Sequence, residues 1–478
     1  MRFSKLAIIA SFAVAILGTN ANAQDLRQPT SVQNTSLNYS YYEQPEAQTS
    51  PSDIVPQGAM PDGACGYDNG CDDGCCDDGC CRSIWPCGCA LADLGEANKL
   101  FDGCFAQCHN ITAGGWLAQS YTWNPYRPVD RFNGPLTWTD RSNEYQMNEL
   151  YGFMGRAAKT DGCGWDWGYR FDALYGTSYR WDTAAGLETN FGSNNAFYGV
   201  ALPQFYGEVA YNDLTVKVGH FISPVGLYTV GTANNFFNTI PYMYQYGQPF
   251  THTGFLATKK FGDKLTAGAG LVYGWDNFDK TGNRWGSYLG TATFTRDNGD
   301  TLAWVGVAGK EPNLTGLNGG FSTRFLQTLV YTHKFSDDVT GIVESDYAQQ
   351  DSAVAGGGQA RWYSLGGWLY WNLTCRCQWG LGGEWFRDEG GTRVGTLVPS
   401  LASPNARGLA RGPGFDGSFY RATFGPKYYF TPNLYGRANF VFDAYVGKKA
   451  GANVPVLPFD DGTKYHQEVG VFDLVYTF

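Results

Sequence analysis

Residues 420–443 read YRATFGPKYYFTPNLYGRANFVFD and decide the fold. Large or apolar side chains alternate with polar ones on both sides of a short turn at residues 431–433. The first set is Tyr420, Ala422, Phe424, Tyr428, Phe430, Leu434, Ala438, Phe440 and Phe442. The second set is Arg421, Thr423, Lys427, Arg437, Asn439 and Asp443. A period of two predicts a pair of antiparallel strands, with one face suited to lipid and the other to a water-filled lumen.

The same pattern recurs from Ile111 to Phe478. We predict 16 strands there, at residues 111–124, 143–155, 164–175, 201–212, 213–222, 252–261, 263–275, 285–296, 300–309, 322–335, 338–349, 361–373, 377–387, 418–430, 433–445 and 463–478. Most are long enough for a tilted strand to cross a bilayer, which takes roughly 9–11 residues. Their number is even, as single-chain bacterial barrels require.

Short and long connections alternate along this region. The short ones are 212–213, 262–263, 297–300, 336–338, 375–376 and 431–433; the long ones are 223–250, 276–284, 310–321, 350–360, 388–417 and 446–462. Tight turns on one side of a membrane and long loops on the other produce this alternation. A large soluble β-sandwich or lectin also shows a period of two, but it does not explain the sorted loop lengths. The predicted fold class is therefore all-β: a transmembrane antiparallel β-barrel of about 16 strands, with a Cys-rich N-terminal extension.

Composition agrees with this fold. Charged residues make up only 16% of the chain, against roughly 25% in typical soluble domains, and aromatic residues make up another 16%. The net charge of −10 disfavours a nucleic-acid partner.

The N-terminal part divides into three segments. Residues 1–23 have a basic start, a short apolar core and an A-x-A site at 21–23, which predicts a signal peptide. Residues 24–64 are polar and Pro-rich, typical of a disordered linker. Residues 65–110 form a Cys-rich segment with a short helix, expected in the periplasm. The barrel domain is expected to span 111–478.

The chain has 13 Cys, and export makes disulfides the default expectation. The disulfide candidates are Cys65, Cys71, Cys75, Cys76, Cys80, Cys81, Cys87, Cys89, Cys104, Cys108, Cys163, Cys375 and Cys377. Cys163, Cys375 and Cys377 fall in short turns, on the side of the membrane expected for the Cys-rich segment. The C-x3-C pairs with interleaved Asp could instead bind a soft metal, but they match the usual zinc spacing poorly, so no metal site is predicted.

Several blocks of sequence carry a family resemblance. Residues 201–260 read ALPQFYGEVAYNDLTVKVGHFISPVGLYTVGTANNFFNTIPYMYQYGQPFTHTGFLATKK, with GGWLAQSYTWNP at 114–125 and RFDALYG at 170–176. Together they resemble the OmpL-like family of outer-membrane β-barrel porins over nearly all of 111–478. The resemblance implies an outer-membrane location and passive passage of solutes, and it brings no catalytic or binding residue. The terminal Phe478 looks like the signal that such barrels present to their assembly machinery.

The phase of the alternation predicts which charges face the lumen. The acidic set is Asp166, Asp172, Glu208, Glu344, Asp346, Glu384, Asp443 and Asp473; the basic set is Arg170, Lys217, Arg421, Lys427 and Arg437. This excess of acidic residues predicts a mild preference for cations.

The long connection 223–250 is unusually apolar for a loop in water. Its candidate constriction residues are Phe236, Phe237, Tyr242 and Tyr244. We expect it to fold into the lumen and narrow the channel; the alternatives are a subunit contact or a cover over the barrel mouth.

The sequence thus predicts an outer-membrane porin that lets small hydrophilic solutes and ions diffuse through a water-filled barrel. The alternative is a structural envelope protein, cross-linked by disulfides, whose barrel is a membrane anchor. The expected partners are outer-membrane lipid, small solutes, a second copy of the chain and a disulfide-linked envelope protein. No cofactor and no enzymatic activity are expected, because the His residues are scattered and no nucleophile motif accompanies them.

Overall fold

The computed structural model describes residues 109–160, 162–190, 197–279, 286–312, 320–351, 358–395, 414–449 and 457–478, together with residues 97, 99 and 106. The predicted signal peptide (1–23) and linker (24–64) lie outside the described residues. So does most of the predicted Cys-rich segment (65–110).

The described chain is almost entirely strand and loop. Its strands are β1 (Thr112–Trp123), β2 (Glu144–Arg156), β3 (Trp165–Gly176), β4 (Gly199–Tyr211), β5 (Leu214–Ile222), β6 (Thr251–Phe261), β7 (Leu265–Val272), β8 (Ser287–Thr295), β9 (Thr301–Pro312), β10 (Phe321–Lys334), β11 (Val339–Gln350), β12 (Ala360–Thr374), β13 (Cys377–Glu389), β14 (Gly417–Thr431), β15 (Leu434–Gly447) and β16 (His466–Thr477). The short helices are α4 (Tyr179–Asp182) and α5 (Tyr242–Gly247), with 3-10 turns η4 (Glu188–Asn190) and η5 (Thr232–Asn234). None of the helices in the described part of the chain is long and apolar enough to cross a membrane.

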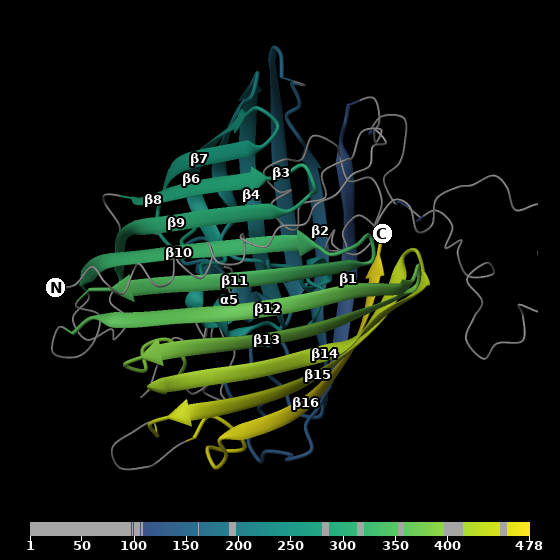
Figure 1. Ribbon diagram of the computed structural model, residues 1–478, viewed down its shortest axis with the longest axis vertical. Helices are drawn as coiled ribbons and strands as arrows, with labels where there is room; N and C mark the ends of the chain where they lie inside the picture. The colour runs from purple at the N-terminus through teal and green to yellow at the C-terminus, as the bar shows by residue number, and fades with distance from the viewer. Residues whose placement is uncertain are drawn as a thin grey trace, which may run out of the picture. The chain divides into compact units, whose positions relative to one another are not determined.

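The strands form one closed barrel in which each strand pairs with its neighbours in sequence. The sheet closes where β1 pairs antiparallel with β16, with Trp116 opposite Thr477 and Trp123 opposite Gly470. Figure 1 shows the strands running around the barrel wall, with α5 inside it. The predicted 16-strand antiparallel barrel is confirmed, and a sandwich of two sheets is excluded because the strands form a single closed sheet.

The two faces of the wall differ as the alternation predicts. In β14, Tyr420 and Phe424 are 45% and 48% exposed, whereas Arg421 and Thr423 are each 5% exposed. The exposed face is apolar and the buried face carries the polar groups, the reverse of a soluble protein. An apolar outer surface on a closed sheet suits lipid, because closure leaves no backbone edge to be satisfied by water.

The connections also follow the predicted parity. Even strands lead to odd strands through short turns, such as the two residues between β4 and β5, and odd strands lead to even strands through long loops. The connection from β2 to β3, residues 157–164, is the longest of the turns. The barrel therefore has a short-turn end and a long-loop end.

A β-bulge changes the phase of β2. The pairing of β1 with β2 shifts between Ala118 and Gln119, where Ala118 faces Glu149 and Gln119 faces Met147. The extra residue, Asn148, and its neighbour Glu149 are consequently both buried. The bulge turns a carboxylate into the barrel at a position that strict alternation does not predict.

Candidate functional site

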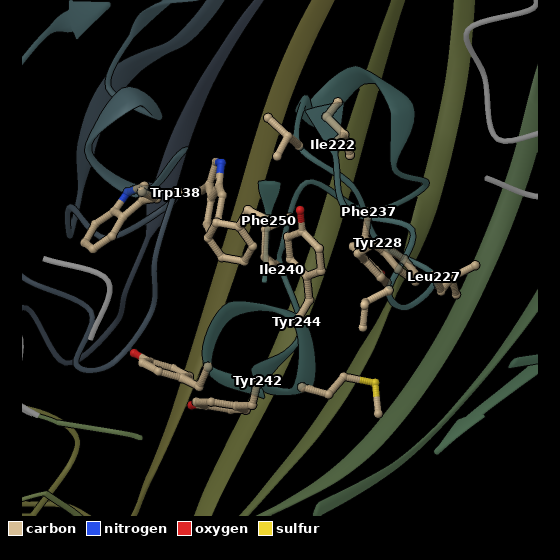
Figure 2. Close-up of a cluster of buried hydrophobic side chains, with 14 of the residues drawn as sticks. Trp138, Ile222, Leu227, Tyr228, Phe237, Ile240, Tyr242, Tyr244 and Phe250 are labelled. Atoms are coloured by element: carbon tan, nitrogen blue, oxygen red, sulfur yellow. The ribbon is translucent and has the colours of Figure 1, made fainter. Parts of the chain in front are cut away.

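Loop 3 (residues 223–250, between β5 and β6) fills part of the barrel interior. Its predicted constriction residues Phe236, Phe237, Tyr242 and Tyr244 are each at most 3% exposed. Figure 2 shows Tyr242, Tyr244 and Phe237 of this loop gathered against the barrel wall. Trp138, from the loop between β1 and β2, joins the cluster with its ring 5.4 Å from that of Phe250. Aromatic packing of this kind buries the apolar loop away from water.

Inward carboxylates accept hydrogen bonds from the backbone of loop 3. Glu384 on β13 accepts from the amides of Tyr242, at 2.6 Å, and Met243, at 3.1 Å. Glu344 on β11 accepts from the amide of Leu227 at 3.1 Å. Glu149 on β2 accepts from the amide of Thr232 at 3.0 Å. Three strands around the barrel thus hold the loop through charge-assisted hydrogen bonds. We call Glu149, Glu344 and Glu384 the carboxylate clamps.

Inward arginines hold the same loop through its carbonyl groups. Arg437 on β15 donates from Nη1 to the carbonyl oxygens of Thr232, at 2.9 Å, and Asn235, at 2.6 Å. Arg421 on β14 donates from Nη1 to the carbonyl of Ile240. Since a free loop would leave these buried groups unsatisfied, the wall and the loop depend on each other.

The register of the strands aligns the inward charges in rows. In the row nearer the long-loop end, Glu384 faces Arg421, and Arg421 faces Asp443. Arg421 Nε lies 2.7 Å from Asp443 Oδ1 and 4.0 Å from Glu384 Oε1. One arginine therefore compensates two carboxylates.

A second row lies nearer the short-turn end. Gln378 faces Lys427, Lys427 faces Arg437, and Arg437 faces Asp473. Arg437 donates from Nε to both carboxylate oxygens of Asp473, at 3.0 and 2.9 Å. We call Gln378, Lys427, Arg437 and Asp473 the lower row.

The predicted charges on β3, β4 and β5 form a separate group. Asp166 pairs with Arg156 at 2.9 Å, Arg170 pairs with Asp172, and Glu208 faces Lys217 across β4 and β5. Asp166, Arg170 and Glu208 are half-buried, unlike the charges that hold loop 3. Asp346, on β11, accepts from Gln248 of loop 3 at 2.7 Å. All the predicted charges lie on the polar face of the wall; their role in lining a pore stays a prediction.

Sequence reasoning missed several inward charges. Glu149 escaped because of the bulge in β2. Glu311 and Arg324, on β9 and β10, lie 3.7 Å apart. Arg324 follows the alternation of the predicted strand 322–335, so the phase could have found it. Glu311 lies beyond the predicted strand 300–309, because β9 extends to Pro312. Arg393, beyond the end of β13, donates from Nε to the carbonyl of Tyr246, and no periodic signal marks it.

Burial affects the titration of the loop tyrosines. It raises the pKa of Tyr228 and of Tyr246, so both phenols stay neutral at physiological pH. Tyr246 uses its hydroxyl to donate to the carbonyl of Pro135, in the loop between β1 and β2. These rings therefore serve packing and neutral hydrogen bonding.

The described cysteines include two free thiols, Cys163 in the turn between β2 and β3 and Cys377 at the start of β13. The structure places neither of these two in a disulfide, so for them the disulfide prediction is not confirmed. Cys375 lies in the short turn between β12 and β13. The ten candidates from Cys65 to Cys108 lie outside the described residues.

A closed sheet of antiparallel strands with an apolar exterior, a charged interior and an inserted loop defines a transmembrane β-barrel of the porin class. The family model described as "Putative beta-barrel porin-2, OmpL-like" matches residues 110–478, and the chain belongs to this family. The protein is a porin channel of the outer membrane, as the sequence predicts. The family match does not favour the alternative of a structural envelope anchor.

Solved structures add a comparison of the fold. The outer membrane channel DcaP of Acinetobacter baumannii has a TM-score of 0.50 at 10% identity, covering 77% of this chain and 97% of that one. OmpT of Vibrio cholerae has a TM-score of 0.49 at 10% identity, with the same coverage. An anion-selective porin from Comamonas acidovorans has a TM-score of 0.49 at 11% identity, covering 77% and 99%. At 10% identity, the similarity to DcaP supports the fold alone. None of the curated proteins compared with the chain matches it.

Proposed function

We propose that the protein lets small hydrophilic solutes and ions diffuse passively across the outer membrane, and that loop 3 sets the width of their path. A hydrated polar lumen removes the cost of dehydrating a solute, and its width and charge then filter what passes. The attachment of loop 3 to the wall by Glu149, Glu344, Glu384, Arg421 and Arg437 is the observation that carries this proposal. A loop held at so many points is suited to a constriction of constant width.

The distribution of exposure supports a path on one side of the barrel. On the polar face, Asp166 and Glu208 are half-buried, as are Thr266 on β7 and Thr291 on β8. Arg421, by contrast, is buried under loop 3 on the β11–β15 side. The solute path we propose therefore runs along β3–β8, beside the loop.

Selectivity would then come from the charges along this path. We propose the mild cation preference expected from the excess of inward acidic residues, weakened because Asp166 and Asp172 are paired with arginines. A reversal potential in a salt gradient that reports anion preference would contradict it.

The proposed partners follow from the surfaces. Outer-membrane lipid would cover the apolar exterior, and a second copy of the chain is the proposed oligomeric partner. A disulfide-linked envelope protein is proposed for the cysteines near the short-turn end. We infer that the protein transports solutes without catalysing a reaction. We also infer that the predicted signal peptide directs its export.

Two measurements test the proposal. Liposomes containing the purified protein should swell in sugars of graded size up to a sharp limit; absence of swelling and of conductance would contradict a channel. Deleting residues 233–238 from loop 3 should raise the single-channel conductance in a planar bilayer, with heat-dependent gel mobility as the control for a folded barrel. An unchanged conductance in a folded deletion variant would rule out loop 3 as the constriction.

A further inference from the structure

Lys427 differs from the other charged members of the lower row. Arg437 and Asp473 satisfy each other, with Nε of Arg437 within 3.0 Å of the carboxylate. Lys427 is completely buried, and its Nζ has no hydrogen-bond acceptor. Burying an ammonium group without a hydrogen-bond acceptor costs roughly several kcal/mol of folding free energy, unless another group compensates the charge.

The surroundings of this ammonium are aromatic. Nζ of Lys427 lies 4.2 Å from the ring centre of Tyr435 and 5.2 Å from that of Tyr429. Contacts with ring faces compensate a cation only in part, at about 0.5–2 kcal/mol each. Arg437, directly opposite on β15, is already compensated by Asp473, so Lys427 is the charge in this row that lacks a partner. The site therefore favours an anion over a further cation.

Further polar groups on the same face lack partners. The hydroxyl of Tyr429 and Nδ2 of Asn439 are buried without hydrogen bonds. Tyr429 lies two residues beyond Lys427 on the same face of β14, and Asn439 lies two residues beyond Arg437 on β15. Because the strands are antiparallel, Tyr429 lies toward the short-turn end and Asn439 toward the long-loop end of the facing pair Lys427 and Arg437. A small acceptor group beside Lys427 therefore has one of these two donors within reach, and not both.

We infer that Lys427 is the centre of a binding site for an oxyanion group, a carboxylate or a phosphate, carried by a small solute. The ammonium supplies the charge, and the Tyr429 hydroxyl, two residues along the same face of β14, supplies a further donor. The inference rests on the proposed function, because the anion reaches Lys427 through the lumen.

The site lies at the level of the tip of loop 3, on the β14–β15 side of the barrel and across from the proposed path along β3–β8. Arg437, which faces Lys427, donates to the carbonyls of Thr232 and Asn235 in this loop. The ring of Tyr429 is buried and packs 5.4 Å from that of Tyr435, so entry of an anion requires the Tyr429 ring to move aside. Tyr435 is held more firmly, because its hydroxyl donates to the carbonyl of Ala233 at 3.2 Å.

Calorimetric titration of the detergent-solubilised full-length protein tests the site, with sodium acetate and sodium phosphate as separate probes at matched ionic strength in sodium chloride. Wild type should bind at least one probe saturably. Lys427→Met should weaken that binding at least roughly tenfold, as expected for loss of a charged hydrogen bond, and Lys427→Arg should retain it. Lys264→Met, which removes the same charge from the turn between β6 and β7, should bind like wild type.

The outcomes separate this inference from the proposed function. Wild type that swells liposomes but binds neither probe, or a folded Lys427→Met variant that binds as wild type does, overturns the inference alone. Wild type that binds a probe through Lys427 but conducts nothing overturns the proposed channel and leaves the site standing. Heat-dependent gel mobility establishes that each variant has folded.

Discussion

Replacing Glu384 with Gln should loosen loop 3 without unfolding the barrel. The Glu384 carboxylate accepts hydrogen bonds from two consecutive loop amides, Tyr242 at 2.6 Å and Met243 at 3.1 Å. A glutamine offers one neutral acceptor oxygen in place of two charged ones. Hydrogen bonds to charged groups contribute about 1.5–3 kcal/mol each, against about 0.5–1.5 kcal/mol for neutral ones. The variant loses one bond and weakens the other, but it also removes the cost of burying a charge, so we expect a net loss of about 2 kcal/mol.

Hydrogen exchange of the loop measures this loss directly. A change of about 2 kcal/mol in local opening corresponds to roughly a 30-fold loss of protection at the Tyr242 and Met243 amides. The matched control is Glu389→Gln, the same substitution on the same strand, where the side chain is 43% exposed and pairs with Arg361 at 3.6 Å. The control should leave loop protection unchanged. If Glu384→Gln also leaves it unchanged, the carboxylate clamps do not hold the loop, and the reasoning is wrong.

Three further predictions follow from the same contacts. Arg437→Met should destabilise the barrel by about 3–5 kcal/mol in urea unfolding, because Asp473 is left buried without its partner; a loss below 1 kcal/mol would contradict this. Gly380→Ala should displace the tip of loop 3 and alter single-channel conductance, because a Cβ there would lie against Phe236 and 2.7 Å from Phe237. Gly383→Ala is the control: the atom nearest to its Cβ would be 3.9 Å away, so the conductance should not change. Burial raises the pKa of Asp416, but hydrogen bonds from Lys448 and the Gly390 amide outweigh it and hold the pKa below its usual 3.8. The charged form is therefore the stabilising one. Its contribution to stability is complete above pH 3.8 and disappears as the pH falls through the lower pKa of the folded state. Asp416→Asn should therefore lower the melting temperature at pH 7, and the variant and wild type should converge in strong acid.

The order and number of the strands could be predicted from the sequence because both signals are local. The period of two places Tyr420 and Arg421 on opposite faces whatever the rest of the chain does. The lengths of the connections are equally local, and the family blocks at 114–125, 170–176 and 201–260 agreed with them. The inward phase of Arg421, Lys427 and Arg437 followed from the same argument and is found in the structure as buried side chains.

The course of loop 3 could not be predicted in the same way. Its composition predicted that it would leave bulk water, but its partners are far away along the chain: Glu149 lies 83 residues before Thr232, and Arg437 lies 205 residues after it. The bulge in β2 that brings Glu149 inward is set by pairing with β1, so alternation within β2 alone misses it. Local sequence thus determined a barrel and the two faces of its wall, because pleating is a property of each strand. Only the closed tertiary structure decided which inward charges meet the loop and which, like Lys427, are left without an acceptor, because closure alone brings distant strands around one interior.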